Sequence, residues 1–251
     1  MKHDQTEKVK NNPRLQYTYF RSCRRCFCAR WMTEPMVKSQ EALAKILKGV
    51  STFQAEVYPA QRAMFERLKR GQDPLAYFIT CADSRMMPNL ITQTGPGEIF
   101  TERNPGNLVP HYGEFVGGVS AGVEYAMLVL KVPLVIICGH TDCGVMKALL
   151  NPEQAHAMPG LQQWMRHASE PQHRILRDHA SANSEEKLRL LTEYNVLAQI
   201  ENLKSHPSVH SRFINREVDI RGWVYDIGNG SIWMADPESG RFEISGGAPS
   251  R

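Results

Sequence analysis

The sequence predicts an α/β protein with a mainly parallel β-sheet flanked by helices, N-terminal helical arms and an antiparallel edge strand. Short apolar segments of strand length alternate with longer helical patterns along the 251 residues, which is typical of α/β folds. The segment from Leu134 to Cys138 is continuously apolar, as expected of a parallel strand covered on both faces. A turn signal from Asp226 to Gly230 separates two strand-like segments and indicates a hairpin at the sheet edge.

The N-terminal segment differs from the rest in composition. Residues 1–35 are polar and basic, and we expect them to form a disordered tail ahead of a single α/β domain over residues 36–251. An arginine-rich, acid-poor segment also fits an organelle presequence, or sequence upstream of the true translation start. Cys23, Cys26 and Cys28 leave a second metal or redox site open. No histidine or second cysteine pair follows at the spacing of a zinc finger, which favours the tail.

The helical arms are expected directly after this tail. Apolar residues recur at helical spacing from Leu43 to Val50, and Gly49 is placed to end that helix. A second helix is expected from Phe53 to Arg70. The remaining predicted elements follow in order: strands over 76–80 and 98–101, a helix over 116–130, a strand over 134–138, a helix after Cys143, an amphipathic helix over 184–204, a short helix after Pro207, and strands over 218–226 and 231–235.

Composition excludes several classes of protein. The chain is 42% hydrophobic and 22% charged, as in ordinary globular proteins. No apolar run approaches the ~18 residues that a membrane span needs. Much of the net charge of +4 comes from the N-terminal segment, so nothing indicates nucleic-acid binding by the folded domain. We therefore expect a cytoplasmic protein without a membrane span, in which cysteines bind metal or take part in catalysis.

Three metal-ligating side chains follow the ends of predicted strands. Cys81 follows the first strand, and His140 and Cys143 follow the third. Ligands bind at the carboxyl ends of strands in open α/β sheets, so these side chains are expected to meet there. Two thiolates and an imidazole are ligands that zinc prefers, and three protein ligands leave the open position of a catalytic site. The sequence thus predicts one Zn²⁺ per chain, which would lower the pKa of a bound water and hold a hydroxide ready.

Asp83 and Arg85 lie two and four residues beyond the first sulfur and form a natural ion pair. An arginine fork gripping the carboxylate would keep Asp83 off the zinc, ready to accept a hydrogen bond from the metal's hydroxide. Asp83 could instead complete a closed, structural zinc site through its own carboxylate. The residues by themselves leave both alternatives open.

Taken together, these motifs resemble those of a known family. Cys81-Ala-Asp-Ser-Arg85 with a distant His140-Thr-Asp-Cys143 resembles the signature of the β-class carbonic anhydrases. The resemblance runs from about Phe53 to about Asp226. It also includes Gln72-Asp-Pro, Pro96-Gly-Glu-Ile-Phe100, Arg103-Asn104, Gly122-Val-Glu-Tyr125 and Gly222-Trp-Val-Tyr-Asp226.

The resemblance implies a role for each site residue. Asp83 and Arg85 would be the catalytic dyad, and in a closed state of the family the matching aspartate is the fourth zinc ligand. Gln72 would donate its amide to a substrate oxygen, a role that adds no competing charge. Phe100 and Tyr125 would line the apolar carbon dioxide pocket of a neighbouring subunit, so the resemblance also implies a homodimer or tetramer.

The resemblance also indicates a branch of the family. In another branch a non-catalytic bicarbonate pocket carries a tryptophan three residues before the first zinc cysteine, where this chain has Phe78. We therefore expect the plant-like, open type, although Arg103 and Tyr225 match other parts of that pocket.

The resulting functional prediction is zinc-dependent reversible hydration of carbon dioxide to bicarbonate and a proton. Carbon dioxide and bicarbonate are the expected ligands, and residues 36–251 the expected catalytic domain. Two alternatives stay open: a hydrolase for carbon disulfide or carbonyl sulfide on the same zinc site, and a non-catalytic protein that binds zinc or bicarbonate. The presence of Asp83, Arg85 and Gln72 argues against the second.

Overall fold

The computed structural model describes residues 34–114 and 117–245. The chain divides into two compact units between Lys69 and Arg70. The predictions for the tail, including Cys23, Cys26 and Cys28, lie outside the described residues, apart from residues 34 and 35. Among the described helices, none is long and apolar enough to cross a membrane.

The first unit is helical, as expected, but its boundaries differ from the prediction. Its elements are α2 (Glu34–Thr52), the π-helical η2 (Phe53–Val57), α3 (Tyr58–Ala60) and α4 (Arg62–Leu68). The expected stop at Gly49 is wrong, because the helix continues through it. A single glycine costs a helix only about 1 kcal/mol, and the flanking residues favour helix enough to absorb that cost. Phe53, Tyr58 and Phe65 pack their rings against one another in this unit.

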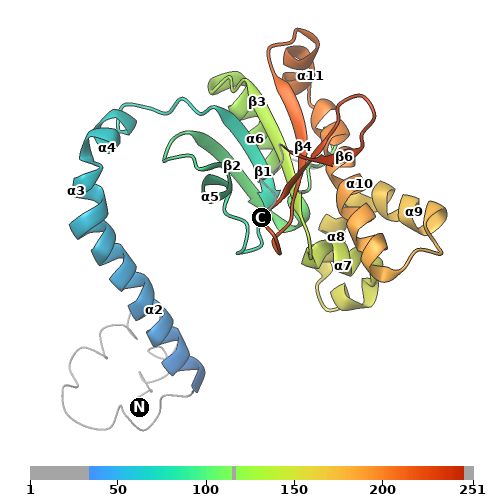
Figure 1. The fold of residues 1–251 in the computed structure, drawn as a ribbon, viewed down its shortest axis with the longest axis horizontal. Coiled ribbons are helices and arrows are strands. Elements are labelled where there is room, and N and C mark those ends of the chain that lie inside the picture. The colour runs from blue at the N-terminus through green and yellow to red at the C-terminus, as the bar shows by residue number, and fades with distance from the viewer. Residues whose placement is uncertain (1–33, 115–116, 246–251) are drawn as a thin grey trace, which may run out of the picture. The chain divides into compact units, whose positions relative to one another are not determined.

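A six-stranded sheet forms the centre of the second unit (Figure 1), with strand order β2-β1-β3-β4-β5-β6. The strands are β1 (Ala76–Cys81), β2 (Ile99–Asn104), β3 (Leu134–His140), β4 (Asp219–Tyr225), β5 (Ile232–Ala235) and β6 (Phe242–Ile244). Strands β1 to β4 pair in parallel, whereas β5 and β6 are antiparallel. The predicted sheet and its C-terminal hairpin are therefore confirmed. Strand β6, which the sequence analysis missed, adds a further antiparallel strand.

Helices cover the sheet and connect its strands. They are α5 (Pro88–Thr92), η3 (Pro105–Asn107), α6 (Gly118–Glu124), the π-helical η4 (Tyr125–Val129), α7 (Gly144–Leu150), η5 (Pro152–Ala155), α8 (Pro159–Met165), η6 (Arg166–Ala168), α9 (Ser169–Asp178), α10 (Ser184–Lys204) and α11 (Pro207–Ile214). Helix α10 has the predicted bounds, and the Asn183 side chain caps it by accepting a hydrogen bond from the Glu186 N–H. The helix predicted over 116–130 is described from Gly118 and becomes π-helical at Tyr125; residue 116 lies outside the described residues.

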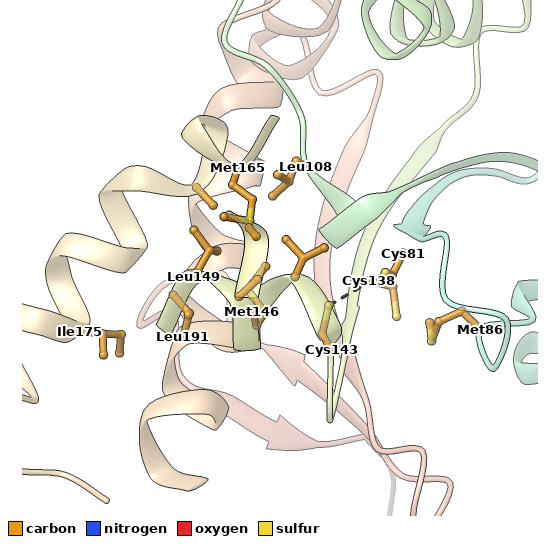
Figure 2. Packing of buried hydrophobic residues seen from close by; sticks show 14 of the residues in the cluster. Cys81, Met86, Leu108, Cys138, Cys143, Met146, Leu149, Met165, Ile175 and Leu191 are labelled. Carbon is orange, nitrogen blue, oxygen red and sulfur yellow. Dashed lines mark hydrogen bonds between the residues drawn. The ribbon is translucent and has the colours of Figure 1, made fainter. Parts of the chain in front are cut away.

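Alternation along the strands divides the core between the two faces of the sheet. Phe78 and Cys138 face one buried cluster, which also includes residues of α7, α8 and α9. Tyr77 and Ile137 face the other cluster, together with residues of α6, η4 and α11. Figure 2 shows that Cys81 and Cys143 belong to the first cluster. The metal-ligand candidates thus lie on the face covered by α7 to α9.

Candidate metal centre

The three predicted ligands are brought together by the sheet. Cys81 is the last residue of β1, His140 is the last residue of β3, and Cys143 directly precedes α7. Strands β1 and β3 pair in parallel with Thr80 opposite Cys138, so both strands end at the same edge. The ligand atoms of the three residues all lie within 4.8 Å of one another, and all three residues are buried. Residues separated by about 60 positions in the sequence therefore form one compact donor set.

The ring of His140 is oriented with one nitrogen directed at this centre. Nδ1 lies 2.8 Å from the carbonyl oxygen of Thr141, and donation to that oxygen fixes the tautomer. Nε2 is buried and has no hydrogen-bond partner among the described residues. A buried nitrogen without a partner is costly unless something binds it. His140 is therefore arranged as a metal ligand through Nε2.

The two cysteine sulfurs also suit a metal ion. Cys81 Sγ and Cys143 Sγ are 4.0 Å apart. Hydrogen bonding from the Cys143 thiol lowers the pKa of Cys81, and the same interaction raises the pKa of Cys143, so Cys81 loses its proton first. The backbone N–H of Gly106 points at Cys81 Sγ over 3.4 Å and favours its thiolate. Two sulfurs and one free imidazole nitrogen fit Zn²⁺.

Helix α10 holds the loop that supports Cys81. Asn195 Nδ2 donates to the carbonyl of Gly106 over 3.1 Å, and Gln199 Oε1 accepts from the N–H of Val109 over 2.8 Å. The indole N–H of Trp164 donates to the carbonyl of Pro105 over 2.8 Å. These positioning residues were not predicted from the sequence. The signal that could have indicated Asn195 and Gln199 is two amides, four residues apart, on the mainly apolar face of an amphipathic helix.

Asp83 and Arg85 form the predicted ion pair beside the ligands. Arg85 Nε donates to Asp83 Oδ1 over 2.9 Å, and Nη2 donates to Oδ2 over 2.7 Å. The backbone N–H of Arg85 adds a third bond to Oδ1. These bonds hold the pKa of Asp83 well below its usual range, so the carboxylate stays ionised. Asp83 Oδ2 lies 3.9 Å from His140 Nε2, which places it at the edge of the metal centre.

An apolar cavity of about 310 Å³ adjoins Cys81 and Asp83. Its walls include Val145, Ala148 and Leu161, and none of the predicted substrate-binding residues lines it. These wall residues were not predicted from the sequence. Val145 and Ala148 are three residues apart on the helix that begins directly after Cys143, so they share one face of that helix beside the ligands.

The three predicted substrate-binding residues lie away from Cys81 within the chain. Gln72 is exposed in the segment before β1. Phe100 packs on the opposite face of the sheet, with its ring centroid 5.8 Å from that of Tyr125. Tyr125 is 45% exposed. The structure thus brings Phe100 and Tyr125 together but does not bring either to the ligands of the same chain.

Cys138 is buried, as expected at the end of an apolar segment covered on both faces, and is not part of the ligand set. Its thiol donates to the carbonyl of Gly139 over 3.3 Å, and burial raises its pKa to about 12. Its sulfur is thus part of the core packing and lies outside the group of ligand atoms formed by Cys81, His140 and Cys143.

Comparison with known proteins agrees with this geometry. The family model described as carbonic anhydrase matches residues 76–232, a range that holds the ligands, Asp83 and Arg85. A carbonic anhydrase of Pseudomonas aeruginosa is 43% identical over 197 residues, covering 78% of this chain and 89% of that protein. One from Synechococcus elongatus is 41% identical over 191 residues, covering 76% of this chain and 70% of that protein.

Solved structures show the same fold. The β-carbonic anhydrase CcaA superposes with a TM-score of 0.79 at 33% identity, covering 81% of this chain and 99% of that chain. One of two tetrameric β-carbonic anhydrases from the ascomycete Sordaria macrospora has a TM-score of 0.70 at 25% identity, covering 77% of this chain and 96% of that one.

Proposed function

This chain belongs to the β-class carbonic anhydrases, and we propose that Asp83 and Arg85 direct its catalysis at the centre formed by Cys81, His140 and Cys143. Its reaction is the zinc-dependent, reversible hydration of carbon dioxide to bicarbonate and a proton. When bound, zinc supplies the nucleophile by lowering the pKa of a water molecule into the neutral range. The chain's own residues orient that nucleophile and receive the substrate.

The observation that carries the proposal is the pair of side-chain hydrogen bonds from Arg85 to Asp83. Both carboxylate oxygens accept hydrogen bonds from the guanidinium, and a bidentate pair of this kind is geometrically specific. The carboxylate is thereby ionised and held at the edge of the ligand set. In this position Asp83 accepts a hydrogen bond from the nucleophile. That bond orients the nucleophile so that the lone pair of the nucleophile's oxygen points toward the substrate carbon.

Held by Arg85, Asp83 does not complete the donor set itself. Arg103 reinforces this arrangement by donating from Nη2 to the backbone carbonyl of Asp83 over 2.7 Å. Phe78, which stands where another branch has tryptophan, is buried edge-to-face against Trp223. These contacts support the plant-like, open type, with Arg103 committed to the backbone rather than to a second bicarbonate.

We further assign the substrate-binding roles of Gln72, Phe100 and Tyr125 to a neighbouring copy of the chain. The placement of Phe100 and Tyr125 supports this, since both lie on the sheet face opposite to Cys81. Gln72 precedes the residues matched by the family model, so its assignment rests on the resemblance. In a homodimer, each copy would complete the other's pocket with an amide donor and apolar rings.

Exposed apolar side chains support an oligomer. Next to Tyr125, Leu128 and Val129 are 61% and 60% exposed. In the first unit, Leu43, Ile46, Leu47 and Val50 form an exposed stripe at helical spacing. Unpartnered apolar faces of this kind mark protein–protein contacts. The tetrameric relatives from Sordaria macrospora agree with a homo-oligomer, for which we propose the dimer as the active unit.

Replacing Asp83 by Asn tests the catalytic assignment. The amide keeps the size of the side chain, but it replaces one acceptor oxygen by an NH2 donor and carries no charge. Hydration measured by stopped flow should fall by at least about 100-fold while the zinc content stays at one per chain. Full activity of Asp83→Asn would remove Asp83 from the mechanism.

The cytoplasmic location and the single domain over residues 36–251 stay predictions.

A further inference from the structure

We propose that Asp142 is a positioning residue, which holds the guanidinium group of Arg85 in place by a hydrogen bond. Lys147 in turn holds Asp142 by an ion pair. The proposal rests on the proposed function, since it matters only if the Arg85–Asp83 pair serves catalysis. It assigns a role to a residue that neither binds the metal nor contacts the substrate. It also explains how a long, partly exposed side chain keeps one geometry.

The contacts of Arg85 extend beyond Asp83. Its Nη1 donates to Asp142 Oδ2 over 3.1 Å, and its Nη2 lies 3.4 Å from the carbonyl oxygen of Asp142. The Nε and Nη2 edge of the guanidinium therefore binds Asp83, while the remaining N–H donors face Asp142. An arginine side chain loses much rotamer entropy when it is fixed, and a single partner leaves part of that freedom in place. A second anchor removes that freedom from the opposite edge.

Asp142 is well suited to act as an anchor because its own position is constrained. It lies between the ligands His140 and Cys143, and its backbone is left-handed with φ 62°. Aspartate tolerates this conformation better than most residues with a side chain. Its other carboxylate oxygen, Oδ1, pairs with the ammonium group of Lys147, five residues further along the chain on α7. The segment that delivers two metal ligands thus also delivers the anchor.

The result is a chain of alternating charges from Lys147 through Asp142 and Arg85 to Asp83. Isolated exposed ion pairs contribute little to stability, because water screens them and long side chains resist ordering. Networks with bidentate arginine geometry are the exception. This network accordingly serves to order Arg85 rather than to stabilise the fold, and its loss should be visible in catalysis before it is visible in unfolding.

The test is a double-mutant cycle on the zinc-loaded enzyme. Asp142→Gly removes the carboxylate and suits the left-handed backbone, whereas Asp142→Asn keeps one neutral acceptor. In the wild-type background we expect kcat/KM for hydration to fall about fivefold to tenfold for Asp142→Gly and less for Asp142→Asn. Combined with Arg85→Ala, Asp142→Gly should change kcat/KM by less than about twofold, since its only proposed route of action has gone.

Crystal structures provide a readout independent of turnover. The wild type should show one Arg85 orientation with both anchors, and Asp142→Gly should show Arg85 released from its fork or in several orientations. The matched control is Asp219→Asn. Asp219 pairs with Arg221 on β4, with side-chain exposures of 53% and 43% that equal those of Asp142 and Arg85. This control should leave kcat/KM unchanged. Should Asp142→Gly fail to fold, Lys147→Met should still give a smaller loss in the same direction.

The outcomes separate this inference from the proposed function. Wild-type activity of Arg85→Ala would overturn the dyad itself, whatever Asp142 does. A second outcome is that Arg85→Ala has low activity and Asp142→Gly lowers kcat/KM by the same factor with and without Arg85. That result would overturn the inference alone, because Asp142 would then act on the segment that carries His140 and Cys143. An unchanged Arg85 fork in the Asp142→Gly crystal would overturn it as well.

Discussion

The backbone N–H of Gly106 lies 3.4 Å from the sulfur of Cys81, on a loop that follows β2. The donor is presented by a left-handed residue with φ 81°. The carbonyl of the same residue accepts a hydrogen bond from Asn195 on α10. A single glycine therefore joins a ligand sulfur to a buried helix, and hydrogen bonds of this kind increase the fraction of thiolate.

Gly106→Ala should weaken both folding and zinc binding. A Cβ on Gly106 would lie 2.8 Å from Val145 Cγ1, and the left-handed backbone disfavours any side chain. We expect a loss of about 2 kcal/mol or more in the free energy of unfolding, with weaker zinc affinity measured by competition with a chelator. Gly160→Ala is the control, because a Cβ there meets nothing within 4 Å. Equal behaviour of the two variants would argue against a role for the Gly106 loop.

The three described cysteines should differ sharply in their contribution to zinc binding. Cys143→Ala removes a ligand, so zinc content should fall well below one per chain. Cys138→Ala removes a core thiol that lies outside the ligand set, so zinc content should stay at one while stability drops by about 1 kcal/mol. Metal analysis of both purified proteins decides this. Loss of zinc from Cys138→Ala at unchanged stability would contradict the ligand assignment.

Tyr77 should make the protein sensitive to alkali. Burial raises the pKa of its phenol above the ordinary value near 10, so the unfolded chain loses the proton first as pH rises. Stability from this residue is therefore intact below about pH 10 and declines above it, by at most about 1.4 kcal/mol per pH unit. Tyr77→Phe should remove this decline in the free energy of unfolding, as measured by urea unfolding at fixed protein concentration.

At neutral pH Tyr77→Phe should be at least as stable as the wild type. The hydroxyl is buried without a hydrogen-bond partner among the described residues, and such a group costs about 1–3 kcal/mol. A clear loss of stability at neutral pH would show that the hydroxyl has a partner in the assembled protein.

Leu128→Arg should break the proposed dimer. Leu128 is exposed beside Tyr125 in η4, so a charge there costs the single chain little but would be desolvated in an interface. Sedimentation should show a shift toward the monomer, and hydration activity should fall with it if a neighbouring copy completes the pocket. A monomer with full activity would contradict the assignment of Phe100 and Tyr125 to the partner's site. Unchanged sedimentation would place the interface elsewhere.

The sequence predicted the ligand set because its chemistry is local to strand ends. Cys81 and His140 each end an apolar parallel strand, and the topology of such sheets brings those ends together. Asp83 and Arg85 were predictable for a similar reason, since two residues of spacing suffice for the observed ion pair. Helix α10 was predicted with its bounds from apolar residues on one face, and the structure adds the Asn183 cap at its start.

What the sequence did not predict depends on contacts between distant segments. Asn195 and Gln199 are ordinary helix residues until their hydrogen bonds to the loop at Gly106 and Val109 are seen. Asp142 likewise acquires significance only through Arg85, 57 positions away. Gly49 was expected to end a helix because glycine propensity was given more weight than the favourable residues around it.

The most direct test of this account is stopped-flow carbon dioxide hydration between about pH 6.5 and about pH 9, with zinc measured on the same sample. The account predicts one zinc per chain and activity that rises around neutrality, since Arg85 holds Asp83 away from the fourth position. Activity that appears only above about pH 8 would contradict the open site and indicate that Asp83 caps the metal. One zinc per chain with no hydration at any pH would contradict the function itself and favour carbon disulfide, carbonyl sulfide or a binding role.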